Sequence, residues 1–158
     1  MKVALVTGAS RGIGRATALA LAAKGFSLFV AAEGTQDELE AVVADCRQSG
    51  SQDARWGIAD LSRPGAAEAM VEAALSAFGR IDVLVNNAGI RCRKAFGTFS
   101  REDFAAVVEV NLAAAFFASQ QYYQRCAPGA AVGLSMSPAN TGQSHQRKTR
   151  FTGRRRQH

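Results

Sequence analysis

The stretch that decides the fold is VALVTGASRGIG, residues 3–14. A short apolar run at 3–7 leads directly into a turn with three glycines, and an Ala- and Leu-rich segment at 13–24 follows with the composition of a helix. A glycine-rich turn between a strand and a helix directs backbone N–H groups toward an anion at the helix N-terminus. The stretch therefore predicts a strand–turn–helix unit whose turn binds phosphate groups.

The glycines of this turn have separate predicted roles. Gly8 permits the tight turn, Gly12 lets a diphosphate approach the main chain, and Gly14 allows the helix to lie close to the sheet. The alternative is a glycine-rich turn that binds no ligand. The residues of this stretch that we predict to bind a dinucleotide are Thr7, Gly8, Ser10, Arg11, Gly12, Ile13 and Gly14.

Outward from this unit, apolar runs alternate with segments of helical period, which is the pattern of βαβ units around a buried parallel sheet. Thr35 and Glu38 form a predicted capping box, and Ser62 with Pro64 is expected to begin another helix. We predict an α/β fold with a doubly wound parallel sheet, strands ordered 3-2-1-4 and a weak fifth strand within 128–137. The predicted strands are 3–7, 27–32, 54–58 and 81–85, and the predicted helices are 13–24, 37–48, 62–78 and 100–123.

Composition divides the chain of 158 residues into two unlike parts. Residues 1–109 hold 12 Lys and Arg and all 13 Asp and Glu, whereas residues 110–158 hold 7 Lys and Arg and no acidic residue. Low hydrophobicity and clustered arginines predict that residues 138–158 are a disordered basic tail, because they bury too little apolar surface to offset the entropy of ordering. Residues 1–137 are then an incomplete dinucleotide-binding domain.

The same composition excludes several classes of protein. There is no run of 18 apolar residues, and the start of the sequence lacks the pattern of a secretory signal, so we expect neither membrane spanning nor secretion. Cys46, Cys92 and Cys126 are odd in number and far apart, so neither a disulfide framework nor a metal motif is predicted. The cytoplasm is the expected compartment.

Four motifs occur in the order found in one family. The pattern TGxxxGIG at residues 7–14 is followed by Asp60-Leu61, by Asn86-Asn87-Ala88-Gly89 and by Asn111. In this order they resemble the short-chain dehydrogenase/reductase family, and among its members the 3-oxoacyl-thioester reductases. The resemblance implies a Rossmann-like domain and an NAD(P)-dependent oxidoreductase that acts on a carbonyl or hydroxyl group of a small-molecule substrate, usually as a homo-oligomer.

The resemblance also assigns roles to residues of these motifs. It implies that Asp60 contacts the adenine ring, that Leu61, Asn87, Ala88 and Gly89 belong to the cofactor site, and that Asn111 holds a water of a proton relay. Without the resemblance, Asp60 could be a turn or helix-capping residue and Asn87 a turn residue, and Asn111 could bond a neighbouring backbone group.

Cofactor choice depends on the residue after the second strand. Glu33 stands there, and its carboxylate would bond a ribose 2′-OH and repel a 2′-phosphate, which favours NAD. Arg11 could reach a 2′-phosphate, so NADP remains an alternative. Glu33 could also be an exposed loop carboxylate without a ligand.

The catalytic pair that the family uses is missing from this sequence. No YxxxK is present, since Cys126 and Ala127 lie four residues after Tyr122 and Tyr123, which we interpret as aromatics of a helix surface or an interface. Ser137, or Ser135, is a candidate remnant of the family's catalytic serine, and either could be an ordinary loop residue. We hypothesise that the reading frame departs from the ancestral one between about Gln120 and Val132, which translation of the other frames of the encoding DNA would test.

Three functions are therefore compared. The first is an oxidoreductase of the named family whose activity in this chain is impaired or absent, with part of its oligomer interface lost. The second is a nucleotide-binding pseudoenzyme without redox activity. The third is nucleic-acid binding by the basic tail, which we do not expect to be specific because a terminal charge run is usually only solvated.

Overall fold

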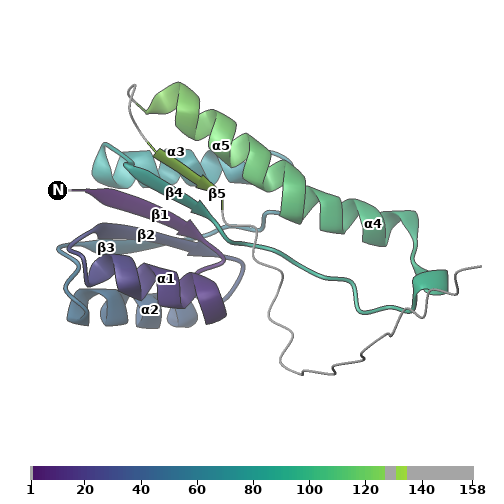
Figure 1. Ribbon diagram of the computed structural model, residues 1–158, viewed down its shortest axis with the longest axis horizontal. Coiled ribbons are helices and arrows are strands. Elements are labelled where there is room, and N and C mark those ends of the chain that lie inside the picture. The colour runs from purple at the N-terminus through teal and green to yellow at the C-terminus, as the bar shows by residue number, and fades with distance from the viewer. Residues whose placement is uncertain (1, 127–130, 135–158) are drawn as a thin grey trace, which may run out of the picture.

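The computed structural model describes residues 2–126 and 131–134. It contains one sheet of five parallel strands in the order β3-β2-β1-β4-β5 (Figure 1). The order predicted for the first four strands is confirmed, and the weak fifth strand pairs with β4, which is therefore not an edge strand. The strands are β1 Val3–Thr7, β2 Ser27–Ala32, β3 Ala54–Ile58, β4 Val83–Asn86 and β5 Ala131–Leu134.

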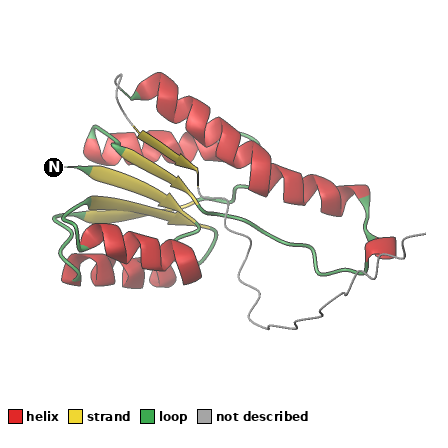
Figure 2. Ribbon diagram, viewed as in Figure 1, coloured by secondary structure: helices red, strands yellow, loops and turns green. Residues whose placement is uncertain are grey.

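Helices cover both faces of the sheet, as a doubly wound fold requires (Figure 2). Helices α1 and α2 lie on one face, α3 and α5 lie on the other, and α4 extends past the carboxyl end of the strands (Figure 1). A 3₁₀ turn at Phe96–Thr98 precedes α4, and a π-helical turn at Glu109–Ala113 joins α4 to α5. The helices are α1 Gly12–Ala22, α2 Gln36–Gln48, α3 Ala66–Phe78, α4 Arg101–Val108 and α5 Ala114–Arg125.

The sheet separates two apolar cores. Every residue of β1 and β2 is buried, and alternate side chains enter opposite cores because a strand has a side-chain period of two. Leu5 packs on the side of α3 and α5, whereas Val6 packs on the side of α1 and α2. Burial on both sides explains why these strands are continuous apolar runs.

Two helix starts agree with the sequence and one does not. Thr35 and Glu38 form the predicted capping box before α2, and Ser100 with Asp103 forms another before α4. The expected start of α3 at Ser62 is wrong, because the Ser62 N–H and hydroxyl donate to Asp60 and hold a turn there. Helix α3 begins instead after Gly65, which has a φ of +83°.

The long helix predicted over residues 100–123 is interrupted. In the sequence, Phe104, Val107, Val108 and Leu112 recur at helical spacing, which predicts one apolar stripe, yet the side chains of Phe104 and Leu112 are 66% and 59% exposed. The π-helical turn changes the angular phase of the residues that follow it, and α4 lies beyond the end of the sheet (Figure 1). The spacing identified a helix correctly, but the stripe is not a buried face in the described part of the chain.

Across residues 2–126 and 131–134, no helix is long and apolar enough to cross a membrane. The predicted basic tail, 138–158, lies outside the described residues.

Candidate functional site

The glycine-rich turn follows β1 and leads directly into α1. Gly8 and Gly12 have φ values of +63° and +57°, a backbone conformation that L side chains rarely adopt. Arg11 is the N-cap of α1 in extended conformation, and its side chain makes no capping hydrogen bond. The N–H groups of the first helical turn therefore lack a side-chain acceptor and are available for an anion at this helix end.

A second segment, the one after β4, holds this turn in place. Thr7 Oγ1 accepts hydrogen bonds from the backbone N–H groups of Asn87 and Ala88, both at 2.9 Å. In return, Asn87 Nδ2 donates to the carbonyl oxygens of Thr7 at 2.9 Å and Gly8 at 3.2 Å. Thr7 is buried, and its hydroxyl binds the backbone of Asn87 and Ala88. These bonds hold the glycine-rich turn and the segment after β4 against each other.

Two of the glycines differ in what a side chain would meet. A Cβ at Gly14 would lie 2.2 Å from the Gly8 carbonyl oxygen and 2.4 Å from Asn87 Nδ2. Both distances are shorter than non-bonded atoms allow, so a side chain at this position would force the turn or the helix to move. A Cβ at Gly12 would have no atom of the described chain within 4 Å. Gly14 thus permits the close approach of helix and turn, whereas Gly12 leaves open space on the side where a ligand could approach.

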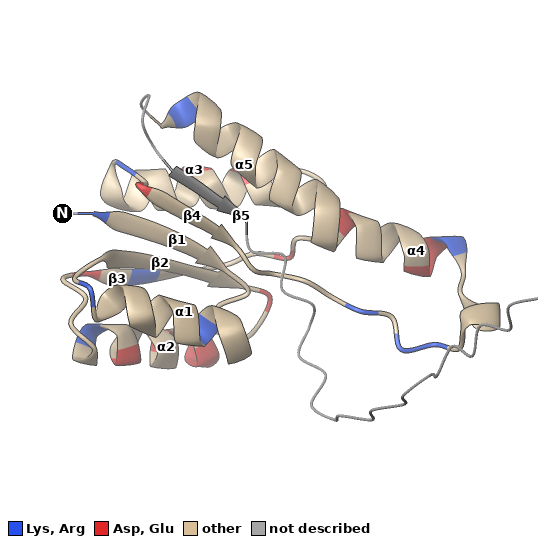
Figure 3. Cartoon of the chain, in the orientation of Figure 1, with Lys and Arg blue, Asp and Glu red and all other residues tan. Residues whose placement is uncertain are grey.

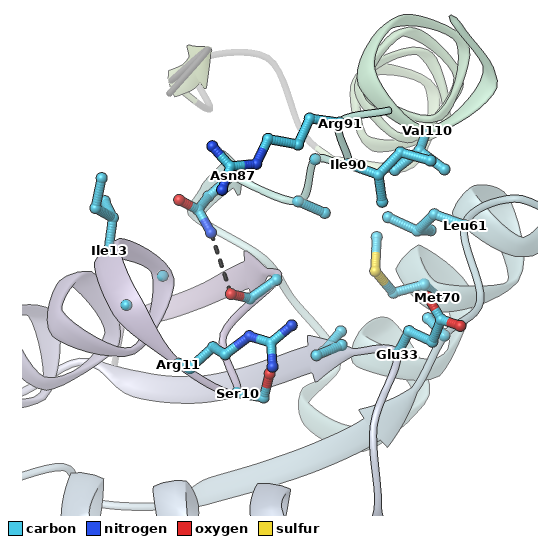
Figure 4. Close-up of a pocket in the computed structure, with 18 of the residues that line it drawn as sticks. Ser10, Arg11, Ile13, Glu33, Leu61, Met70, Asn87, Ile90, Arg91 and Val110 are labelled. Atoms are coloured by element: carbon cyan, nitrogen blue, oxygen red, sulfur yellow. Dashed lines mark hydrogen bonds between the residues drawn. The ribbon is translucent and has the colours of Figure 1, made fainter. Parts of the chain in front are cut away.

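These segments line a pocket of about 710 Å³ at the carboxyl edge of the sheet (Figure 4). The pocket lies where the strand order reverses around β1, and in open α/β sheets ligands bind at this place. The residues predicted from the sequence that line it are Gly8, Ser10, Arg11, Gly12, Ile13, Gly14, Glu33, Leu61, Asn87, Ala88 and Gly89. Sequence reasoning missed Ala31, Ala32, Ala59, Met70, Ile90, Arg91, Arg93 and Val110.

Asp60 is not among the lining residues. Its carboxylate accepts hydrogen bonds from the Ser62 N–H and hydroxyl and from Arg63 Nε. These bonds lower the pKa of Asp60 from its ordinary value, and the bond from the Ser62 hydroxyl has the largest effect. The side chain therefore holds the turn before α3 as an ionised acceptor, directly beside lining residues Ala59 and Leu61.

Asn111 also lies outside the lining set and supports it from behind. Its Nδ2 donates to the Ile90 carbonyl oxygen at 2.9 Å, and its Oδ1 accepts from the Ile90 N–H at 2.7 Å. Asn111 belongs to the π-helical turn, a geometry that occurs often at functional sites. The pair of bonds ties the end of the NNAG segment to the helical layer. Ser135 and Ser137 lie outside the described residues.

The two adjacent tyrosines of α5 have opposite environments. Tyr122 is 1% exposed and its hydroxyl donates to the Asp82 carbonyl oxygen at 3.0 Å, whereas Tyr123 is 81% exposed. Burial raises the pKa of Tyr122 to about 12. The interpretation of the pair as surface aromatics is therefore wrong for Tyr122, which anchors α5 beside the start of β4, at the end of the strand away from the pocket.

The charges around the pocket are unequal. Arg11, Arg91 and Arg93 line it, and Glu33 is the acidic residue among the lining residues. In the described part of the chain, no group of three His, Cys, Asp or Glu side chains could hold a metal ion. The arrangement suits an organic anion bound by backbone N–H groups and guanidinium groups.

The doubly wound sheet, the glycine-rich turn at its carboxyl edge and the pocket at the strand reversal define an α/β protein of the Rossmann-like class. The family described as short chain dehydrogenase matches residues 2–134, and the chain belongs to this family.

Curated relatives carry reductase names. The chain is 41% identical over 119 residues to a 3-oxoacyl-[acyl-carrier-protein] reductase of Synechocystis, covering 75% of this chain and 48% of the relative. It is 38% identical over 148 residues to the short-chain reductase protein NovJ of Streptomyces niveus, covering 90% of this chain and 56% of that protein. The chain thus spans about half the length of the curated relatives it matches.

Solved structures agree with the family. A short chain dehydrogenase from Burkholderia cenocepacia in complex with NADP superposes with a TM-score of 0.79 at 37% identity, over 84% of this chain and 54% of that one. A short-chain dehydrogenase/reductase from Serratia marcescens gives a TM-score of 0.78 at 32% identity, with the same coverage of both chains.

Proposed function

We propose that the pocket binds a nicotinamide dinucleotide, with its pyrophosphate at the N-terminus of α1. The observation that carries the proposal is the open space beside Gly12, next to helix N–H groups that the N-cap side chain leaves uncapped. A phosphate there meets aligned N–H donors and the positive end of the helix dipole. The bound dinucleotide would also lie against Ser10, Ile13, Ala88 and Gly89, which line the pocket.

Cofactor preference is proposed to be NAD. Glu33 lines the pocket just after β2, where a carboxylate accepts a hydrogen bond from a ribose 2′-OH. The Burkholderia relative is in complex with NADP, and Arg11, which lines the pocket, is the residue that would bind a 2′-phosphate. Glu33→Gln should therefore reduce or reverse the preference for NAD over NADP, measured as the ratio of their dissociation constants. Arg11→Gln should weaken the binding of NADP more than the binding of NAD.

For the whole protein we propose an oxidoreductase acting on a carbonyl or hydroxyl group, as the names of the relatives suggest. The dinucleotide, when bound, supplies or accepts the hydride. Asn111 and Ser137 are the proposed remnants of the catalytic set, and Asp60 and Leu61 are proposed to lie beside the adenosine half of the cofactor.

Hydride transfer by this chain is proposed to be absent or slow. Positioned acid–base catalysis contributes roughly 10²–10⁴-fold, and the sequence has no YxxxK to supply it. Tyr122 is a poor substitute, because its hydroxyl is buried, donates to the Asp82 carbonyl and has a raised pKa. The second candidate is a nucleotide-binding pseudoenzyme, which rests on the absence of YxxxK and on the burial of Tyr122.

Calorimetry with NAD, followed by a dehydrogenase assay on the same sample, tests both candidates. Binding without turnover favours the pseudoenzyme, and turnover after removal of contaminating dehydrogenases favours an active oxidoreductase. Gly14→Trp is the control variant that should not bind NAD, because its side chain must displace the Gly8 carbonyl and Asn87. If Gly14→Trp binds NAD as well as the parent, the assigned binding site is wrong.

The remaining proposals concern the setting of the protein. Residues 1–137 are proposed as the dinucleotide-binding unit, with a small molecule as its substrate. The cytoplasm is the proposed compartment, because Cys46, Cys92 and Cys126 are all free.

A further inference from the structure

Two arginines on the segment after β4 have no assigned role. Arg91 and Arg93 both line the pocket and are exposed, while Cys92 between them is half-buried. Alternate residues of an extended segment project to the same side, which accounts for this pattern. Figure 4 shows the Arg91 side chain directed over the pocket toward Asn87.

Among the described residues, neither guanidinium has a partner in a hydrogen bond or an ion pair. The neighbouring Lys94 differs, because its Nζ donates to both carboxylate oxygens of Asp103 at 2.7 Å. Figure 3 shows the basic residues following one another along the loop between β4 and α4. The sequence after Glu109 contains no Asp or Glu, so its undescribed residues cannot supply a carboxylate side chain to Arg91 or Arg93.

The position of these arginines separates them from the place proposed for a 2′-phosphate. Glu33 follows β2 and Arg91 follows β4, and β1 lies between these two strands. Neighbouring strands are about 4.8 Å apart, so the two sides of the pocket are on the order of 10 Å apart at the sheet. The pyrophosphate is proposed to lie at Gly12, after β1, and a 2′-phosphate would lie toward Glu33. Arg91 and Arg93 therefore lie on the β4 side of the pocket, on the other side of β1 from Glu33.

We propose that Arg91 and Arg93 form a binding site for an anionic group of the substrate, a carboxylate or a phosphate ester on the molecule that carries the carbonyl or hydroxyl group. Guanidinium groups bind both kinds of oxyanion through paired hydrogen bonds. The inference rests on the proposed function, because it names the substrate class of the same pocket.

Binding of three small ketones to the NAD-saturated chain tests the proposal without requiring turnover. Acetoacetate carries a carboxylate, dihydroxyacetone phosphate carries a phosphate, and pentane-2,4-dione is neutral. Each is titrated calorimetrically into the parent, into Arg91→Gln/Arg93→Gln and into the control Arg101→Gln. Arg101 is also exposed, but it is outside the lining set and has no ion pair in the described chain.

The expected result is that the parent binds at least one anionic ketone roughly tenfold more tightly than the neutral one, since hydrogen bonds to charged groups are the stronger kind. The double variant should lose this preference, and Arg101→Gln should keep it. Comparison of acetoacetate with dihydroxyacetone phosphate identifies the preferred anion.

Equal binding of all three ketones by the parent, or an unchanged anion preference in the double variant, would overturn the inference. NAD is titrated alone in the same samples, and a normal NAD isotherm then leaves the proposed function intact. Absence of NAD binding by the parent would instead remove the proposed function and this inference with it.

Discussion

The sheet and the arm that follows it contain similar apolar residues in opposite environments. We define the arm as residues 91–113, which follow the NNAG segment and Ile90 and run through α4 and the π-helical turn. Strand β1 is buried at every position, whereas Phe96, Phe104 and Leu112 of the arm are all more than half exposed. Apolar content is therefore not sufficient for burial. A side chain is buried only where the topology brings a second layer over it.

The largest expected effect comes from the anchor between α5 and the sheet. Tyr122→Ala should lower the free energy of unfolding by about 3–5 kcal/mol, because it removes a buried aromatic ring and leaves a cavity between α5 and β4. Urea denaturation measures the change. Tyr123→Ala is the matched control and should change stability by less than about 0.5 kcal/mol. Similar losses in both variants would mean that α5 does not pack as described.

A smaller loss is expected where the helix meets the turn. Gly14→Ala places a Cβ within 2.4 Å of both the Gly8 carbonyl oxygen and Asn87 Nδ2, and overpacking of this kind costs about 1–3 kcal/mol. Thermal denaturation should show the loss, and calorimetry should show weaker NAD binding. Gly97→Ala in the arm is the control, since its Cβ would meet no described atom within 4 Å. An unaffected Gly14→Ala variant would contradict the close approach.

The connection between the arm and the site is expected to contribute less. Asn111→Ala removes both hydrogen bonds to Ile90, and a hydrogen bond of this kind contributes about 0.5–1.5 kcal/mol. Hydrogen exchange of the Ile90 amide should become faster, while the amides of β1 keep their protection. If the Ile90 amide exchanges at the parent rate, Asn111 is not what holds the arm to the site.

The smallest effect on stability is expected at the exposed face of the arm. Phe104→Ser should change the free energy of unfolding by less than about 0.5 kcal/mol, because the side chain is mostly exposed already. It should nevertheless reduce self-association in analytical ultracentrifugation, since exposed apolar patches promote association. Val71→Ser, at a fully buried position of α3, should do the reverse and destabilise the chain. Destabilisation by Phe104→Ser would show that the arm packs in solution.

Local signals predicted most of the fold. The glycine-rich turn, the strands 27–32 and 54–58 and the Thr35–Glu38 capping box were predictable because neighbouring residues determine them. The start of α3 was not, since Ser62 has the composition of an N-cap but donates to Asp60 instead. The π-helical turn was also unpredictable, because apolar spacing alone does not reveal an extra residue within a helix.

The candidate site divides in the same way. The motifs predicted eleven of the lining residues, whereas Met70 of α3 and Val110 of the π-helical turn enter the pocket from the face of the sheet opposite α1 and α2. Arg91 and Arg93 had a detectable signal, because they are two basic residues separated by Cys92 that begin two positions after the NNAG segment. The roles of Thr7 and Asn111 as supports behind the pocket depend on hydrogen bonds to residues far along the chain.

The sequence by itself determined the strand–turn–helix unit, the parallel sheet and the family, because these depend on residue order and on period along the chain. Only the tertiary structure decided which side chains face the pocket and which support it. It also decided that Tyr122 is buried beside an exposed Tyr123, and that Phe104 and Leu112 are exposed. The physical reason is that burial and hydrogen-bond partners depend on which distant segment lies opposite a residue, and a local pattern does not contain that information.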